Sequence, residues 1–157
     1  MKITLLTVGK TEDAYIKEGI EKYVKRLKHY TKLELVDLPE LKNTKALTQE
    51  QQKVKEAELI LKKITPLDYV ILLDEKGLEL SSTQFAELIN KRSVSSSANI
   101  IFVVGGPYGF DAIVYQRAND KLSLSRMTFS HQMVRLFFVE QLYRAYTIIK
   151  GEPYHHS

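Results

Sequence analysis

Two uninterrupted apolar runs constrain the fold more than any other feature of this sequence. They are Tyr69–Leu73 (YVILL) and Ile100–Val104 (IIFVV). Strands that are buried on both faces have this pattern, because helices packed on each side of a parallel sheet leave no solvent-facing positions for alternating polar residues. Both runs are far shorter than the ~20 residues that span a bilayer. We therefore interpret them as central strands of a parallel sheet.

Helical patterns alternate with further strands on either side of these two runs. Additional strands are predicted at Ile3–Val8 and Leu33–Leu38, and a short one near Lys121–Leu124. Helices are predicted from residue 11, over 48–64, from residue 81 or 82, over 111–118 and over 131–150. This alternation indicates an α/β fold with a mostly parallel sheet and helices on both faces. At 157 residues the chain has the length of a single domain, residues 1–157.

Capping and turn signals place several of the element boundaries. Thr11 is expected to cap the first helix, with Glu12 and Asp13 in its first turn, where acidic residues suit the helix dipole. Thr48–Gln51 is a capping box, and Asp74–Gly77 is expected to be the exit turn of its strand. The buried stripe of the 48–64 helix is predicted to consist of Val54, Ala57, Leu61 and Ile64.

Composition excludes some chemistries and leaves others open. With no cysteine, the chain has no disulfides, thiolate metal sites or cysteine nucleophile. The net charge of +4 permits a nucleic-acid partner without establishing one. Lysines 17, 22, 25 and 28 are either a solvated helix face or a surface that follows phosphates. The N-terminus reads as a strand and not as a signal peptide, so we expect a cytoplasmic protein without a membrane segment.

The segment from His131 to Lys150 has apolar residues in nearly every direction around a helical wheel. A helix of this kind must be covered on all sides. If the sheet covers only one side, a second copy of the chain is the simplest cover for the other, which predicts a homodimer. The alternative is burial between the sheet and another helix of the same chain.

The carboxyl ends of parallel strands are where α/β folds bind ligands. This rule predicts a pocket rimmed by Leu73–Gly77, Gly105–Gly109 and the segment after Leu124. The glycine segment (GGPYG) lets backbone approach a ligand closely, although a tight turn explains it equally well. It lacks the Gly-Lys-Ser/Thr of a Walker A loop.

Ionisable residues in the last helix and the tail are a second group of candidates. His131 and Arg135 lie one helical turn apart, as do Glu140 and Arg144. Pairs of this kind are usually structural, but within an otherwise apolar helix they need partners, which a functional pocket supplies. The end of the chain, with Tyr154 and His155, is either part of that site or a disordered tail. Nothing in the sequence suggests a metal site.

Several segments together carry a family resemblance. Val103–Gly106 (VVGG), Leu122–Arg135 (LSLSRMTFSHQMVR) and Glu140–His155 (EQLYRAYTIIKGEPYH) resemble the bacterial ribosomal RNA large-subunit methyltransferase H family, of the SPOUT class. The likeness extends over the whole chain, beginning with Met1–Lys10. One departure is Ser130, where the family often has proline.

The resemblance implies a C-terminal trefoil knot, S-adenosylmethionine as methyl donor, an obligate homodimer, and methylation of N3 of a pseudouridine in large-subunit ribosomal RNA. Carried over to this sequence, it assigns the cofactor pocket to Leu73, Gly105, Ser123, Leu124, Ser125, Arg126, Met127 and Thr128. Our candidates for the catalytic group are Glu140, Arg144, Tyr154 and His155, with His131 and Arg135 supporting the loop or the RNA.

The roles within the catalytic group stay partly open. Arg144 would favour an imidate oxygen or a phosphate, and Glu140 would hold Arg144. The general base is left open among Glu140, Tyr154 and His155. Two other functions compete with the methyltransferase: a non-catalytic RNA-binding or ribosome-associated factor, and a nucleotide hydrolase that uses the glycine segment. No separate RNA-binding domain is evident, so we expect an assembled ribosomal particle to be the substrate.

Overall fold

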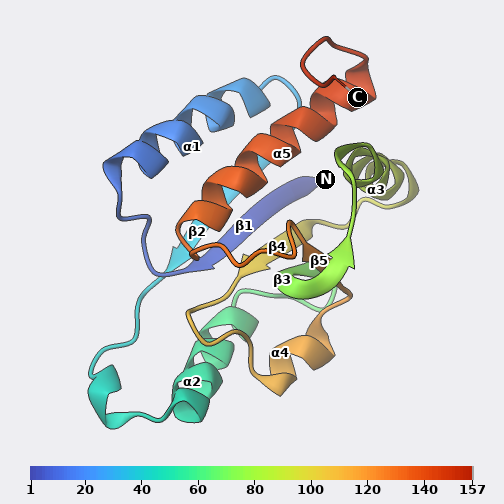
Figure 1. Cartoon of the computed structure of the whole chain (residues 1–157). Coiled ribbons are helices and arrows are strands. Elements are labelled where there is room, and N and C mark those ends of the chain that lie inside the picture. The colour runs from blue at the N-terminus through green and yellow to red at the C-terminus, as the bar shows by residue number, and fades with distance from the viewer. Residues whose placement is uncertain (157) are drawn as a thin grey trace.

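A computed structural model describes residues 1–156 as a five-stranded, all-parallel sheet with helices on both faces (Figure 1). The strand order is β2-β1-β4-β3-β5. The strands are β1 (Lys2–Val8), β2 (Lys32–Leu38), β3 (Tyr69–Glu79), β4 (Ile100–Val104) and β5 (Asp120–Ser123). The helices are α1 (Ala14–Leu27), α2 (Gln49–Leu61), α3 (Ser82–Ser95), α4 (Ala112–Arg117) and α5 (Met133–Lys150), with a short 3₁₀ turn at Thr44–Ala46.

Alternate residues of the central strands pack into two separate hydrophobic cores, one on each face of the sheet. Ile100, Phe102 and Val104 of β4 face α1, α3 and α5, whereas Ile101 and Val103 face α2 and α4. Figure 1 shows the same division, with α1, α5 and α3 on one side of the sheet and α2 and α4 on the other. This arrangement confirms the predicted α/β fold and explains why the two apolar runs have no polar positions.

The predicted exit turn at Asp74–Gly77 is wrong, because β3 continues to Glu79. Its pairing with β5 is interrupted by a register shift between Leu73 and Leu78 and then resumes. A Cβ on Gly77 would lie 2.7 Å from the backbone of Leu122, so glycine allows the two strands to pass this closely. The polar residues that suggested a turn belong to a β-bulge at the sheet edge.

The predicted start of the first helix is also wrong. Asp13, not Thr11, is the N-cap of α1, and the first turn contains no acidic residue. The Thr11 hydroxyl instead accepts a hydrogen bond from Arg135 Nη1 at 3.2 Å, and the backbone N–H of Glu12 donates to Gln132 Oε1 at 2.9 Å. Contacts with the start of α5 therefore hold residues 11–12 outside the helix.

The second helix keeps its predicted cap but differs in its buried face. The Thr48–Gln51 capping box forms, and Ser81 forms a second one with Gln84. However, α2 ends at Leu61 and not at Ile64, and it buries Glu56, Ala57 and Ile60. Val54, expected in the buried stripe, is exposed. The helix is therefore rotated relative to the prediction, with a carboxylate on its inner face.

Helix α5 packs against the sheet between α1 and α3. The premise that only the sheet covers it is therefore wrong, and burial within the chain explains most of its apolar surface. Phe137 is the clearest exception, at 38% exposed. The homodimer remains a prediction, as does the knot. Among the helices described, none is long and apolar enough to cross a bilayer.

Candidate functional site

The carboxyl ends of β4 and β5, together with Leu73–Glu75 where β3 bulges, form the rim of a cavity of about 380 Å³, a size typical of small-molecule sites. The strand-end rule predicted this location. Six of the predicted cofactor residues line the cavity: Leu73, Gly105, Leu124, Ser125, Met127 and Thr128. Two do not. Ser123 is buried beneath the loop, and the Arg126 side chain is 84% exposed and pairs with Glu79.

The glycine segment forms one wall of this cavity with its backbone. The N–H of Gly109 donates to the carbonyl of Gly106 at 3.2 Å, and Gly109 has a φ of +82°, which favours glycine. A Cβ on Gly105 would lie 2.9 Å from the Phe110 ring. The segment is a tight turn that also presents bare backbone to the cavity, so the two interpretations of its sequence are compatible.

The facing wall is the loop that follows β5, and its own hydrogen bonds hold it in place. Ser123 Oγ donates to the carbonyl of Ser125 at 2.7 Å, and Ser125 Oγ accepts from the N–H of Met127 at 2.9 Å. Thr128 Oγ1 donates to Glu75 Oε2 at 2.5 Å, which ties the loop to the bulge of β3. The hydroxyls that drew attention in the sequence therefore shape the loop. Ser123 acts from beneath it and does not line the cavity.

The lining of the cavity carries negative charge. Asp74 and Glu75 line it, and of the described residues around it none is lysine or arginine. Asp74 accepts a hydrogen bond from the Tyr115 hydroxyl. Burial, together with this carboxylate, raises the pKa of Tyr115 above its ordinary value, so the phenol stays neutral. Such a lining suits a cationic ligand and disfavours a polyphosphate.

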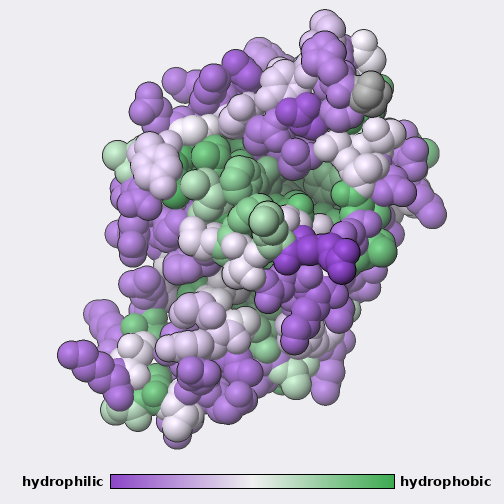
Figure 2. Space-filling model, in the orientation of Figure 1, coloured by the Kyte–Doolittle hydropathy of each residue, from purple (hydrophilic) through white to green (hydrophobic). Residues whose placement is uncertain are grey.

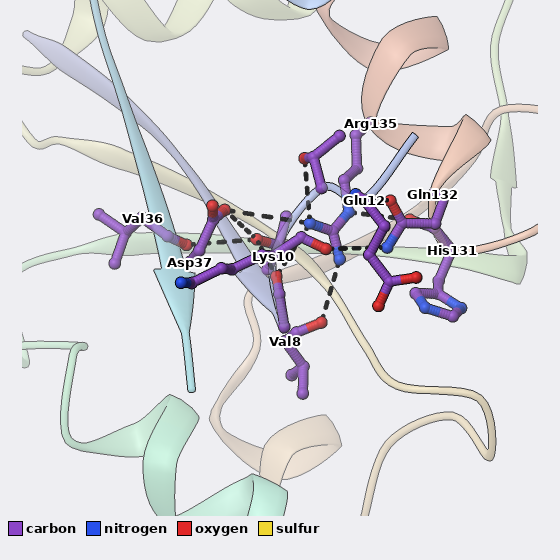
Figure 3. A network of polar contacts seen from close by, with 11 residues as sticks. Val8, Lys10, Glu12, Val36, Asp37, His131, Gln132 and Arg135 are labelled. Atoms are coloured by element: carbon purple, nitrogen blue, oxygen red, sulfur yellow. Dashed lines mark hydrogen bonds and ion pairs between the residues drawn. The ribbon is translucent and has the colours of Figure 1, made fainter. Parts of the chain in front are cut away.

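Arg135 is buried, at 1% exposed, and links the start of α5 to the end of β1 (Figure 3). Its guanidinium donates to the carbonyl groups of Val8, Gly9 and His131 at 3.0, 2.9 and 3.1 Å. Burial lowers the pKa of Arg135, and nearby carboxylates, Asp37 first, oppose that shift. This position leaves no surface for RNA contact and fits the supporting role.

His131 lines the cavity, and Figure 3 shows its ring turned away from the Arg135 guanidinium. The two residues share one turn of the chain but face different surroundings. Across residues 1–156, no group of three His, Asp or Glu side chains has the arrangement of a metal site.

All four catalytic candidates meet in one cluster at the far end of α5. Arg144 Nη2 donates to Glu140 Oε1 at 2.7 Å, and the Tyr154 hydroxyl donates to the same oxygen at 3.0 Å. Arg144 Nη1 lies 3.2 Å from His155 Nδ1, and its guanidinium stacks over the Tyr154 ring. Residues 151–156 therefore fold back on α5. Gly151, at φ +69°, ends the helix with the hydrogen-bond pattern of a Schellman motif.

The geometry of the cluster bears on which residue can be the general base. Burial first, then hydrogen bonds with Tyr23 and Glu140, raise the pKa of Tyr154, so this phenol is a donor and not a base. A guanidinium has only donors, so His155 Nδ1 must accept, which leaves its proton on Nε2. Glu140 is already engaged by Arg144 and Tyr154. Arranged in this way, the cluster presents donors to a substrate.

The cavity and the cluster of the same chain are separate. The last cavity residue on α5 is Val134, and at ~1.5 Å per residue Arg144 lies about 15 Å further along the helix. An apolar hollow lies between them, visible as the green depression near the centre of Figure 2. Its apolar lining consists of Leu80, Phe85, Leu122, Leu124, Phe129 and Phe137, and the polar residues Ser81, Ser82, Ser123 and Gln141 also line it.

Two residues of the site were missed in the sequence. Tyr23 falls at helical spacing with Ile16, Ile20 and Leu27, which predicts a place in the apolar stripe of α1, but its hydroxyl lies 3.4 Å from that of Tyr154. Glu56 is not part of the stripe predicted to be buried on α2, yet it is 4% exposed and lies beneath the glycine segment. A tyrosine in a buried stripe was a signal that a polar partner had to exist for its hydroxyl. Glu56 left no comparable signal.

Comparison with known proteins places the chain in a class. Residues 1–155 match the model of the family described as predicted SPOUT methyltransferase. The chain belongs to this SPOUT methyltransferase family, which agrees with the parallel sheet and the strand-end cavity.

Individual relatives make the likeness more specific. The chain is 57% identical over 156 residues to the ribosomal RNA large subunit methyltransferase H of Cytophaga hutchinsonii, covering 99% of this chain and 100% of the relative. It is 53% identical to the protein of the same name from Parabacteroides distasonis and 52% identical to that from Bacteroides fragilis, over the full length of both chains in each pair.

Proposed function

We propose that this methyltransferase transfers a methyl group from S-adenosylmethionine to N3 of a pseudouridine in large-subunit ribosomal RNA. The observation that carries the proposal is the strand-end cavity, with its bare glycine backbone and negative lining. The names of the full-length relatives support ribosomal RNA as substrate. We further propose that the protein acts in the cytoplasm, where it meets ribosomal particles.

The cavity residues fit the cofactor chemically. S-adenosylmethionine supplies an electrophilic methyl group on a positively charged sulfur. Asp74 and Glu75 favour that charge, and Leu73, Leu124 and Met127 offer apolar surface to the adenosine part. At Gly105 and Gly106 the space of a Cβ is occupied from behind by the Phe110 ring and the Glu56 carboxyl, so both residues offer only main chain to the cofactor.

The cluster residues fit the other half of the reaction. A neutral imide nitrogen is a poor nucleophile, so N3 must lose its proton, here to solvent water, as the methyl group passes from the sulfur to N3 and the donor leaves as a neutral thioether. Arg144 can stabilise the negative oxygen that results, and Glu140 and Tyr154 hold its guanidinium in place. His155 adds an Nε2–H donor beside it. Alignment of donor and acceptor supplies the remaining rate enhancement, which can amount to several kcal/mol.

A homodimer would bring the two halves together. Because Glu140 and Arg144 lie about 9 and 15 Å beyond the cavity along α5, we propose that the cluster of a second copy faces the cavity of the first. The apolar hollow with Phe137 and Phe129 is the surface we assign to this contact. It lies between the two groups and shares Leu122, Leu124 and Phe129 with the cavity.

Recognition of RNA must come from the same small domain. Lys22, Lys25 and Lys28 follow one another along α1, whose Tyr23 touches the cluster, so phosphate contacts would flank the reacting base. We propose that an assembled ribosomal particle is the substrate, because phosphates alone carry little sequence information. Efficient methylation of a short naked hairpin would contradict this part.

Calorimetric titration with S-adenosylmethionine tests the cavity and separates the rival functions. We expect one site per chain, and Gly105→Val should abolish binding, since its side chain has no room beside Phe110. A non-catalytic RNA-binding factor would show no binding in either form. A nucleotide hydrolase would bind ATP in preference, which the negative lining of the cavity opposes.

A further inference from the structure

A buried carboxyl group lies directly behind the glycine segment of the cavity. Glu56, on the inner face of α2, is 4% exposed. A Cβ on Gly106 would lie 2.6 Å from each of its carboxyl oxygens and 2.9 Å from its carboxyl carbon. The carboxyl group therefore points both of its oxygens at the α-carbon of Gly106, from the side of the segment away from the cavity.

Glu56 has little support from its surroundings. Across residues 1–156 its one hydrogen bond comes from Gln52 Nε2 at 3.4 Å, and no salt bridge reaches it. Burial raises the pKa of this carboxyl, and the Gln52 hydrogen bond opposes that shift. An apolar side chain would be expected at such a position if packing were its only purpose, because burying a poorly paired carboxyl group costs stability.

The contact between Glu56 and Gly106 lies directly behind the wall of the cavity. Gly106 lines the cavity together with Gly105, Pro107 and Gly109, and its carbonyl closes the turn with the N–H of Gly109. Gly105 is fixed from behind by the Phe110 ring in the same way. The wall thus has two supports, one apolar and one carboxylic, and both occupy the space that a side chain on the glycine would need.

We propose that Glu56 is a positioning residue. It acts through Gly106 to fix the position of the main chain that binds the methyl donor. This inference rests on the proposed function for its ligand, and on contacts in the free protein for its mechanism. Glycine is then needed at position 106 for two reasons: a side chain there would collide with the Glu56 carboxyl group, and the main chain there contacts the methyl donor. Truncating Glu56 should therefore loosen the wall without touching the catalytic cluster.

A double-mutant cycle on S-adenosylmethionine binding tests the contact. Glu56→Ala should raise Kd about tenfold and leave kcat at saturating donor unchanged, whereas Glu56→Gln, of the same size, should remain within about threefold of the native Kd. Gly106→Ala should raise Kd about a hundredfold, because its Cβ meets the carboxyl. Combined with Glu56→Ala it should bind better than Gly106→Ala alone, and combined with Glu56→Gln it should not. The matched control is Glu58→Ala, on the exposed face of α2.

Amide hydrogen exchange in the free protein provides a second readout that needs no ligand. Residues 105–110 should exchange faster in Glu56→Ala and Gly106→Ala than in Glu58→Ala. If Glu56→Ala fails to fold, Gly106→Ala still tests the contact through exchange in both the segment and α2. Native exchange rates in both Glu56→Ala and Gly106→Ala would overturn the proposal. Effects on Kd that simply multiply in the double-mutant cycle would overturn it too, because the two residues would then act independently. If the native protein binds no S-adenosylmethionine, the proposed cofactor is wrong, and the exchange data still decide the role of Glu56.

Discussion

Tyr154 and Arg144 are joined through one carboxylate oxygen, Glu140 Oε1, and this shared acceptor determines what each can do. The phenol is a donor held neutral by its surroundings, and the guanidinium is held by the carboxylate for use on a substrate. Neither side chain lines the cavity. Removing either one should therefore affect turnover and spare the affinity for the methyl donor.

Tyr154→Phe removes the hydrogen bond to a charged acceptor, and such bonds contribute about 1.5–3 kcal/mol. If the cluster reaches the transition state, kcat should fall ~10- to 100-fold. Arg144→Ala and His155→Ala should lower kcat in the same way, each with an unchanged Kd for S-adenosylmethionine. Tyr15→Phe is the control, because Tyr15 is 62% exposed on α1. An equal loss of donor affinity in the cluster variants would show that this division of roles is mistaken.

Between elements, Arg135 is the main polar link, since it joins the first turn of α5 to the last residues of β1. Arg135→Ala leaves the carbonyl groups of Val8 and Gly9 without this partner in a buried place. The free energy of unfolding should fall by about 3–5 kcal/mol, measured by urea denaturation. Arg126→Ala, at an exposed arginine, should change it by less than ~0.5 kcal/mol. Similar values for the two variants would argue against a supporting role for Arg135.

A second link joins the turn after α1 to the tail, where the Tyr30 hydroxyl donates to Glu152 at 2.5 Å. This hydrogen bond, more than burial, raises the pKa of Tyr30 from 10.0 to about 12. The folded protein therefore holds the phenolic proton more tightly, and the resulting stability is complete below pH 10 and lost as pH rises through 12. Unfolding free energy should fall less steeply over that interval in Tyr30→Phe. Identical slopes would mean that the link does not form in solution.

Local signals in the sequence predicted the elements well where the chain itself determines them. The bounds of β4 and the Thr48–Gln51 capping box are as predicted, and Ser81 is the cap of α3, one of the two serines proposed for it. Burial on two faces and side-chain caps leave signals within a few residues. The errors lie where distant segments decide. Thr11 is engaged by Arg135, 124 positions away, and β3 continues beyond Asp74–Gly77 because Leu78 and Glu79 pair again with β5.

The candidate site shows the same limit. The strand-end rule located the cavity, and the resemblance supplied residues that line it. Neither indicated that the four candidate catalytic residues lie apart from the cavity, because spacing along a helix does not say which side chains the tail will contact. The burial of Glu56 was not predicted for a similar reason, because α2 is rotated relative to the face that was expected to be buried.

For the whole molecule, the separation of the cavity and the cluster means that the proposed function requires a second copy of the chain. Phe137→Asp places a charge in the apolar hollow, so the native mass in solution should be twice 18.1 kDa and that of the variant 18.1 kDa. Analytical ultracentrifugation measures both. A native monomer that still turns over would remove the reason for a second copy.

Mixing two inactive variants tests where each half of the site comes from. Gly105→Val disables the cavity and Arg144→Ala disables the cluster. If each active centre combines both chains, mixed dimers have one intact centre, and refolding the variants together should restore about a quarter of native activity. No recovery would place the cavity and the cluster of one chain in the same centre.

The central claim is that the strand-end cavity delivers a methyl group to ribosomal RNA, and transfer from labelled S-adenosylmethionine tests it most directly. Ribosomes from cells that lack this protein would be incubated with the purified chain, and their large-subunit RNA mapped by mass spectrometry. The account predicts one added methyl group, on a pseudouridine, and none with Gly105→Val. Unmodified RNA with the native chain, or a label that lands on another base, would contradict it.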